Sequence, residues 1–280
     1  MLATEPVHIA GWRAELALGF EHRMQRTVLA HRRHDGPLVV QKPLYPEGDA
    51  VCHAIIVHPP AGVAGGDVLE CAVQLGEGAQ ALLTTPGAGK WYRSAGPWAR
   101  QRLAFDVAAG GCLEWLPQET ILFDGARAAL ETEVRLAPGA RYLGWEILCL
   151  GRTGSGERFA HGECSLHSRL RIDGRSVWLE RGRIAADGPL MQAQAGLAGS
   201  TVCGTLIATG APVDDARLAA CRALSPARGR GAVTRLPALL VARYLGNSGE
   251  AARAYFAALW RLLREPFAGR AAVEPRIWRT

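Results

Sequence analysis

The side chains in this sequence with the most evident chemical potential are carboxylates that lie at or beside turns. Glu119 and Asp124 are five residues apart, so an extended backbone would place them on opposite faces, which does not suit a general acid and base acting together. Each carboxylate has a simpler alternative role, since acidic residues at turns are commonly solvated. The acidic candidates are Asp67, Glu114, Glu119, Asp124, Glu146 and Glu157.

The sequence lacks the spacings that identify the common catalytic and metal sites. No histidine pair has the H-E-x-x-H spacing, and no cysteine pair has the C-x-x-C spacing of a zinc site. No G-x-S-x-G nucleophile motif occurs. A phosphate-binding loop is excluded before Lys90, because Thr84 stands where its first glycine should be and Trp91 follows the lysine. The residues alone therefore indicate scattered oxygen ligands without a catalytic constellation.

Composition indicates a globular protein, and the sign of its net charge suggests acidic partners. The 280 residues carry a net charge of +6, which comes almost entirely from arginine. The basic runs lack interleaved aromatic residues, so nucleic acid is not the expected partner. Seven cysteines without paired spacing favour reduced thiols, and no apolar run approaches the ~20 residues of a membrane helix. We therefore expect a cytoplasmic protein that does not enter a membrane.

The chain is organised around the segment from His58 to Ser94. Within it, Val68–Leu75 is predicted to be a strand, a Gly-Glu-Gly turn follows, and Ala79–Thr85 returns as a second strand. The pattern Leu-x-x-Gly-Ala that ends the first strand recurs twice in similar form, at intervals of 32 and 29 residues. Such a repeat predicts stacked β-layers, as in a solenoid, although an antiparallel sandwich would also contain regularly spaced hairpins.

Other segments complete a mainly β fold with about two helices in the C-terminal half. Period-two alternation from Trp12 to Phe20 predicts an edge strand, and Asp173-Gly174 predicts the turn of a hairpin. Helices are expected at 214–224 and 249–264, the second ending before Pro266. No low-complexity linker interrupts the chain, so we expect residues 1–280 to form a single domain.

Five segments, read together and in order, resemble the UreD family of urease accessory proteins, which is called UreH in some organisms. Two residues depart from the family pattern, namely Ala61, where glycine is common, and Trp91, where phenylalanine is common. The segments are 36–48 (GPLVVQKPLYPEG), 58–67 (HPPAGVAGGD), 84–94 (TTPGAGKWYRS), 115–125 (WLPQETILFDG) and 151–159 (GRTGSGERF).

The resemblance implies a fold of stacked β-sheets with two helices and a role that is not enzymatic. Proteins of this family act as scaffolds that join UreF and the GTPase UreG to the urease apoprotein and help to place nickel in its active site. The resemblance therefore implies no permanently bound cofactor and Ni²⁺ only in transit.

A nickel relay requires weak, exchanging oxygen ligands, because tight thiolate sites would retain the ion. On this basis the resemblance makes Asp67, Glu119 and Asp124 the first candidates for lining a nickel path, with Glu146 and Glu157 next. Their alternative role is to fix turns through backbone N–H groups. Lys90, Arg93 and Arg152 are expected to form salt bridges or to contact partner proteins.

Two other functions remain compatible with the residues. A β-solenoid enzyme acting on an acidic polysaccharide would use the positive charge and carboxylates, and would need acids and bases clustered on one stacked face. A β-sandwich module that binds an acidic protein without any metal would need only the positive charge.

Overall fold

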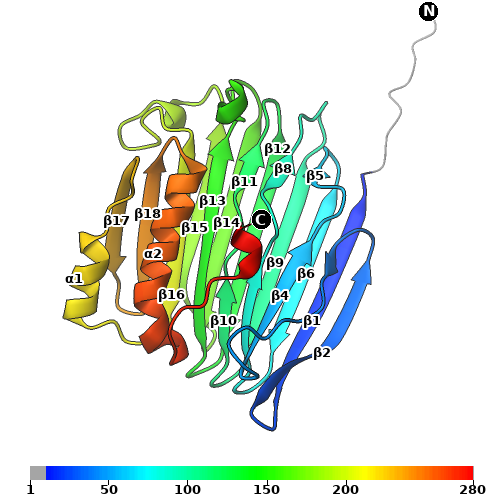
Figure 1. Cartoon of the computed structure of the whole chain (residues 1–280). Coiled ribbons are helices and arrows are strands. Elements are labelled where there is room, and N and C mark those ends of the chain that lie inside the picture. The colour runs from blue at the N-terminus through cyan, green and yellow to red at the C-terminus, as the bar shows by residue number, and fades with distance from the viewer. Residues whose placement is uncertain (1–10, 280) are drawn as a thin grey trace, which may run out of the picture.

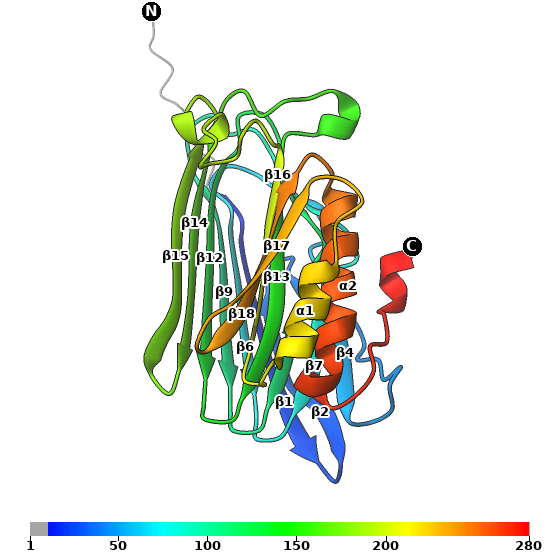
Figure 2. The ribbon, with the colours of Figure 1, turned by 90° about the vertical axis from the view of Figure 1, so that its left-hand side faces the viewer.

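The computed structural model describes residues 11–279 and consists of two β-sheets packed face to face, with two α-helices on the outer side of one sheet (Figures 1 and 2). The sheet without helices is the first sheet and the helix-covered sheet is the second sheet. In spatial order the first sheet contains β15 (Arg175–Ala185), β14 (Glu163–Ile172), β12 (Arg127–Leu136), β9 (Ala99–Val107), β6 (Val68–Leu75), β1 (Arg13–Arg23) and β2 (Arg26–Asp35).

The second sheet packs against the first, and three strands at one of its edges are antiparallel to their neighbours. The short strands β5 (Gly62–Val63), β8 (Gly89–Trp91) and β11 (Thr120–Leu122) pair with one another, and β11 also pairs with β13. In spatial order the rest of the sheet contains β17 (Arg230–Arg235), β18 (Leu239–Gly246), β16 (Val202–Thr209), β13 (Arg141–Leu150), β10 (Cys112–Trp115), β7 (Gln80–Thr84), β4 (Val51–Val57) and β3 (Val39–Val40).

The middle of the chain winds between the two sheets as the repeat predicted. Strands β6, β9 and β12 are parallel neighbours in the first sheet, and β7, β10 and β13 are parallel neighbours in the second. Each crossing has a turn glycine at positive φ, a backbone conformation that is unfavourable for residues with a side chain. These glycines are Gly78 (67°), Gly110 (67°) and Gly139 (74°). The stacked, solenoid-like fold is therefore confirmed.

Strand β1 has the predicted alternation but not the predicted position. Ala14, Leu16, Leu18 and Phe20 are buried, as period two requires. The prediction of an edge strand was wrong, because β2 pairs with the outer side of β1.

Apolar side chains form two cores. One lies between the sheets and includes Leu16, Val73, Phe105 and Leu150. The other lies between the second sheet and the helices α1 (Asp215–Ala223) and α2 (Gly249–Ala268). The first core therefore encloses the space between the sheets, and the second attaches the helices.

Helix α2 continues through Pro266, so the prediction that proline ends it was wrong. Proline lacks the N–H that would normally bond to the carbonyl four residues earlier, at Leu262. That carbonyl instead accepts a hydrogen bond from Arg217 Nη1 of α1 at 2.8 Å. The helix ends at Gly269, which takes the left-handed conformation common at helix C-termini. No helix in residues 11–279 has the length and apolarity to span a membrane.

Candidate functional site

A cavity of about 840 Å³ lies between the two sheets. Its lining extends from the loop before β8, at 85–88, to strands β15 and β18. Apolar side chains cover most of the wall because the cavity interrupts the core between the sheets. The polar side chains that reach it are the candidates for binding a cargo.

Glu146 projects into this cavity from the second sheet. Strand alternation on β13 directs it between Gly144 and Leu148 toward the first sheet, where Thr132 Oγ1 donates a hydrogen bond to its carboxylate at 2.6 Å. Burial raises the pKa of Glu146 above its ordinary value, because the ionised form is poorly solvated there. The position therefore favours a compensating cation or proton.

Two other carboxylates, Glu119 and Glu180, line the same cavity. Glu119 pairs with Arg253 of α2 at 3.3 Å, and its side chain is 15% exposed. Glu180 on β15 accepts a 2.7 Å hydrogen bond from Arg243 on β18, which joins the edge strand of the first sheet to the second sheet. The cavity thus holds three carboxylates, and the arginine partners of Glu119 and Glu180 balance their charges.

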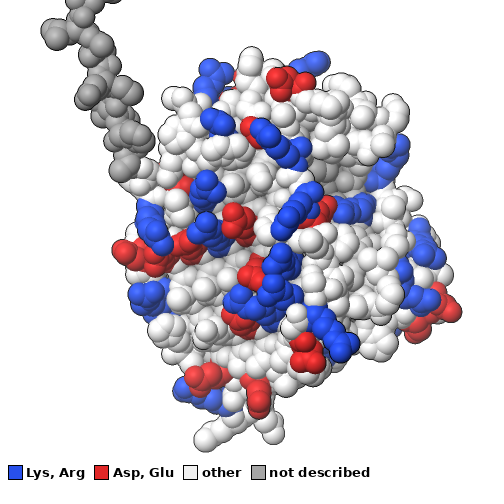
Figure 3. Space-filling model, turned by 180° about the vertical axis from the view of Figure 1, so that it is seen from behind, with Lys and Arg blue, Asp and Glu red and all other residues white. Residues whose placement is uncertain are grey.

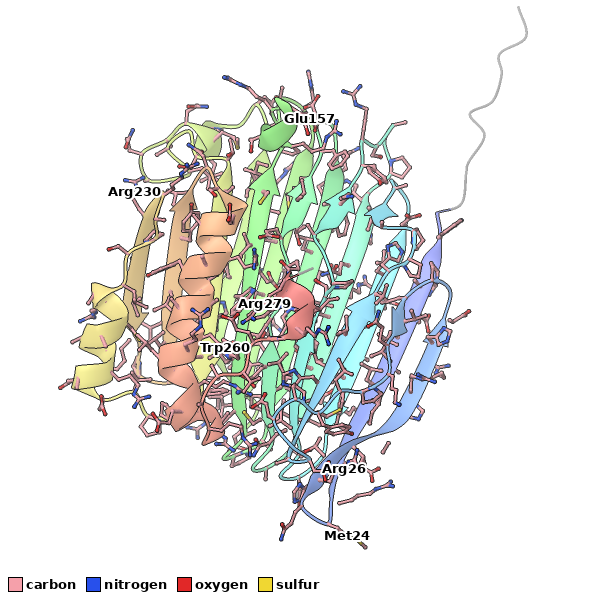
Figure 4. All side chains as sticks on the ribbon, viewed as in Figure 1. Met24, Arg26, Glu157, Arg230, Trp260 and Arg279 are labelled. Atoms are coloured by element: carbon pink, nitrogen blue, oxygen red, sulfur yellow. The ribbon has the colours of Figure 1, made fainter. Side chains whose placement is uncertain are left out.

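Asp124 and Glu157, by contrast, belong to a group of charged residues at the loop end of the sheets (Figure 4, where Glu157 is labelled). Asp124 accepts backbone hydrogen bonds from Ala160 and His161, each 2.8 Å, and a side-chain bond from Arg93 at 3.1 Å. Glu157 accepts a 2.8 Å bond from the backbone N–H of Asp124 and pairs with Arg152. These acids and arginines therefore fix loops to one another.

The pKa values of these two acids reflect those bonds. Burial opposes ionisation of Asp124, but hydrogen bonds from the backbone and ring of His161 outweigh it and lower the pKa to about 2. The hydrogen bond from Arg152 lowers the pKa of Glu157. Both groups are carboxylates at neutral pH and are already saturated with donors.

Asp67 and Lys90 lie apart from that group. The carboxylate of Asp67 accepts the N–H groups of Trp12 and Ala64, each at 2.8 Å, so it fixes the glycine-rich turn to the first residues of the described chain. Nearby Ala61 has a positive φ of 60°, which explains why glycine suits that position. Lys90 is exposed and lies at the loop end of the cavity.

Replacing Asp124 with asparagine is expected to lower the free energy of unfolding by about 1–2 kcal/mol at pH 7, because charge-assisted hydrogen bonds are lost. Because the pKa of Asp124 is lower in the folded state than in the unfolded state, where it is 3.8, the ionised carboxylate stabilises the fold above that pH. This contribution disappears as the pH falls toward 2. Urea unfolding at several pH values should show the difference between wild type and D124N narrowing from pH 4 to pH 2. A constant difference would contradict this role.

Sequence analysis did not single out two features that the structure brings together. Glu180 could have been found by alternation, since it shares a strand face with Trp178 and Ile184. The second feature is a buried charge network around Arg264 of α2, whose side chain is fully enclosed. Arg264 bonds to Glu47 at 2.7 Å and to Glu114 at 3.0 Å.

This network fastens α2 to the second sheet. Glu114 also accepts a 2.6 Å hydrogen bond from Nε1 of Trp260, the residue of α2 that Figure 4 labels. Glu47 contacts His53 Nε2 at 2.5 Å. Burial opposes the charges, but the mutual hydrogen bonds outweigh it, so the pKa of Arg264 is raised and that of Glu47 is lowered. The network is structural and lies outside the cavity lining.

Within residues 11–279, no three His, Cys, Asp or Glu side chains lie close enough together to hold a metal ion. The predicted carboxylates therefore divide by position. Glu119 and Glu146 line the cavity, whereas Asp67, Asp124 and Glu157 accept hydrogen bonds from loop backbone.

Comparison with known proteins gives one family along almost the entire chain. The model of the UreD urease accessory protein family matches residues 13–279. A urease accessory protein UreD from Dechloromonas aromatica is 55% identical over 281 residues, covering 99% of this chain and 98% of its own length. Those from an Azoarcus species and from Pseudomonas aeruginosa are 57% and 50% identical, and each alignment covers 96% of this chain and 95% of the relative. This chain therefore belongs to the UreD family of urease accessory proteins.

Proposed function

We propose that this protein matures urease as a non-enzymatic scaffold and that Ni²⁺ in transit passes through the cavity between its sheets. In this proposal it joins UreF, and through UreF the GTPase UreG, to the urease apoprotein. The observation that supports the passage is the placement of Glu119, Glu146 and Glu180 along one cavity whose lining extends from the loop end to strands β15 and β18.

The chemistry of the cavity suits a cation that must move on. Carboxylate oxygens bind divalent nickel less tightly than thiolates, and separated single carboxylates hold an ion more weakly than a closed shell of ligands does. Glu146 is the central group, because the poorly solvated carboxylate gains most from a passing positive charge. Trp115 also lines the cavity, and its Nε1 has no hydrogen-bond partner among the described residues, so it could donate a hydrogen bond to water in the passage.

The loop-end group supports the passage indirectly. The loops that follow β11 and β13 are held in place by Asp124, Glu157 and their arginine partners. These loops lie next to the cavity residues of the β8 region. Asp67 does the same for the turn before β6. We therefore propose that Asp67, Asp124 and Glu157 shape the loop end of the cavity. Glu119, Glu146 and Glu180 would contact the ion.

Deletion of the gene for this protein tests the function as a whole. Urease should still be synthesised but should contain little nickel when it is purified and analysed by mass spectrometry. Expression of the intact protein from a plasmid should restore the nickel content. Urease with normal nickel content in the deletion strain would contradict the proposal.

A further inference from the structure

The outer face of the first sheet carries charges that are balanced on one side and unbalanced on the other. Figure 3 views this face: blue and red side chains alternate toward the side of β1, and blue side chains gather toward the side of β14 and β15. Arg102 on β9 pairs with Glu70 and Glu131 at 3.2 Å, and Arg135 on β12 pairs with Glu133 at 3.0 Å. On these strands the charges largely cancel.

The hairpin β14–β15 has arginines in excess of its acids. Arg171 and Arg183 have carboxylate partners, Glu133 and Glu163. The guanidinium groups of Arg169, Arg175 and Arg181 have no carboxylate within 4 Å among residues 11–279. This part of the face therefore presents uncompensated positive charge.

The same hairpin ends the sheet with an open strand. Strand β15 is 11 residues long and pairs only with β14, so one side of its backbone has unpaired N–H and C=O groups. In Figure 2 this edge faces the viewer and no helix crosses the long middle part of the strand. Leu179, which lies between the arginines, is 52% exposed.

We propose that an acidic, extended segment of the urease apoprotein adds to this edge as a further strand. An added strand would pair its backbone with β15, and every second side chain would lie beside Leu179, Arg181 and Arg183 on the outer face. A carboxylate opposite Arg181, which has no acidic partner in the described chain, and an apolar residue opposite Leu179 would match that order. This inference rests on the proposed function, because it assigns one of its partners to a surface.

Charge also excludes the simplest alternative occupant, a second copy of this chain. Two β15 edges brought together would place the uncompensated Arg181 of one copy near the arginines of the other, and like charges across paired strands are destabilising. An acidic strand removes the repulsion, so the edge is selective for a partner of opposite charge.

The test uses the complete maturation complex, isolated through a tag on UreF, and measures the urease apoprotein retained. The double variant R169E/R181E should retain at least tenfold less urease than wild type. The control R228E/R230E changes the net charge equally at the edge of the other sheet and should retain a wild-type amount. Equal melting temperatures of the two variants would establish that both are folded.

Hydrogen exchange of the β15 amides provides a second measurement, which charge attraction without strand pairing would not change. Amides of β15 should exchange more slowly when urease is present than when it is absent, and this protection should disappear in R169E/R181E. Unchanged urease retention by R169E/R181E would overturn the inference and leave the proposed function standing. So would displacement of urease by a DNA duplex without protection of β15, which would indicate a general polyanion surface. Wild-type complex that retains no urease would instead contradict the proposed function itself.

Discussion

Replacing Arg264 with leucine is expected to lower the free energy of unfolding by about 3–5 kcal/mol, the largest effect on stability that we predict. The substitution would leave the buried carboxylates of Glu47 and Glu114, whose side chains are 3% and 2% exposed, without their shared cation. It would also remove the bond from Arg264 Nη1 to the carbonyl of Ala271, at 2.7 Å, which holds the chain after α2. Urea unfolding followed by tryptophan fluorescence measures the change.

The matched control is R261L, three residues earlier on the same helix. Arg261 pairs with Glu274 where the two side chains are 50% and 24% exposed, so its loss should cost about 0–1 kcal/mol. Adding E47Q and E114Q to R264L should recover part of the stability, because the uncompensated charges disappear. If R264L cost no more than R261L, the buried network would not be what fastens α2 to the sheet.

The double variant E119Q/E146Q is expected to reduce the nickel content of urease at least tenfold while leaving the maturation complex assembled. Glutamine keeps the shape of both side chains, and its Oε1 can still accept the 2.6 Å bond from Thr132 at position 146. What disappears is the negative charge of two of the three cavity carboxylates, and with it the attraction for a dication. Nickel per urease active site, measured by mass spectrometry, gives the result.

The control for this experiment removes the same charge from the opposite face. Glu131 and Glu133 lie on β12, beside the cavity residue Thr132, but form ion pairs with arginines on the outer surface. E131Q/E133Q should therefore deliver nickel as wild type does. Equal nickel contents with both double variants would exclude the cavity carboxylates from the path.

Strands with one buried face could be predicted from the sequence, because the alternation of apolar and polar residues identifies the side chains that are buried. The segments around Val68, Leu103 and Leu130 recur with a glycine turn, and that period also predicted the stacking. Most of strand β2 could not be predicted, because 31–35 are all exposed and polar and only pairing with β1 makes them a strand. The apolar segment 236–244 is ambiguous from sequence alone, because Pro237 obscures whether it is a strand or a helix, and the structure forms β18 at Leu239–Gly246.

The position of the carboxylates could be predicted only in part. Glu119 and Glu146 were candidates and line the cavity, yet nothing in their local sequence distinguishes them from Asp124, which is saturated by loop N–H groups. Local sequence also gives no indication of contacts between distant residues. Arg264 and Glu47 are 217 residues apart, and only the folded helix brings them together.

The most direct test of the passage fills the cavity without changing a charge. Ser168 on β14 lines the cavity opposite Thr132, and phenylalanine there would occupy the space that an ion and its water must cross. Ser165 points to the outer face of the same strand, so S165F is the matched control. With S168F the complex should still assemble, but urease matured by it should contain at least tenfold less nickel than urease matured with S165F or wild type. Full nickel content with S168F would contradict passage through the cavity.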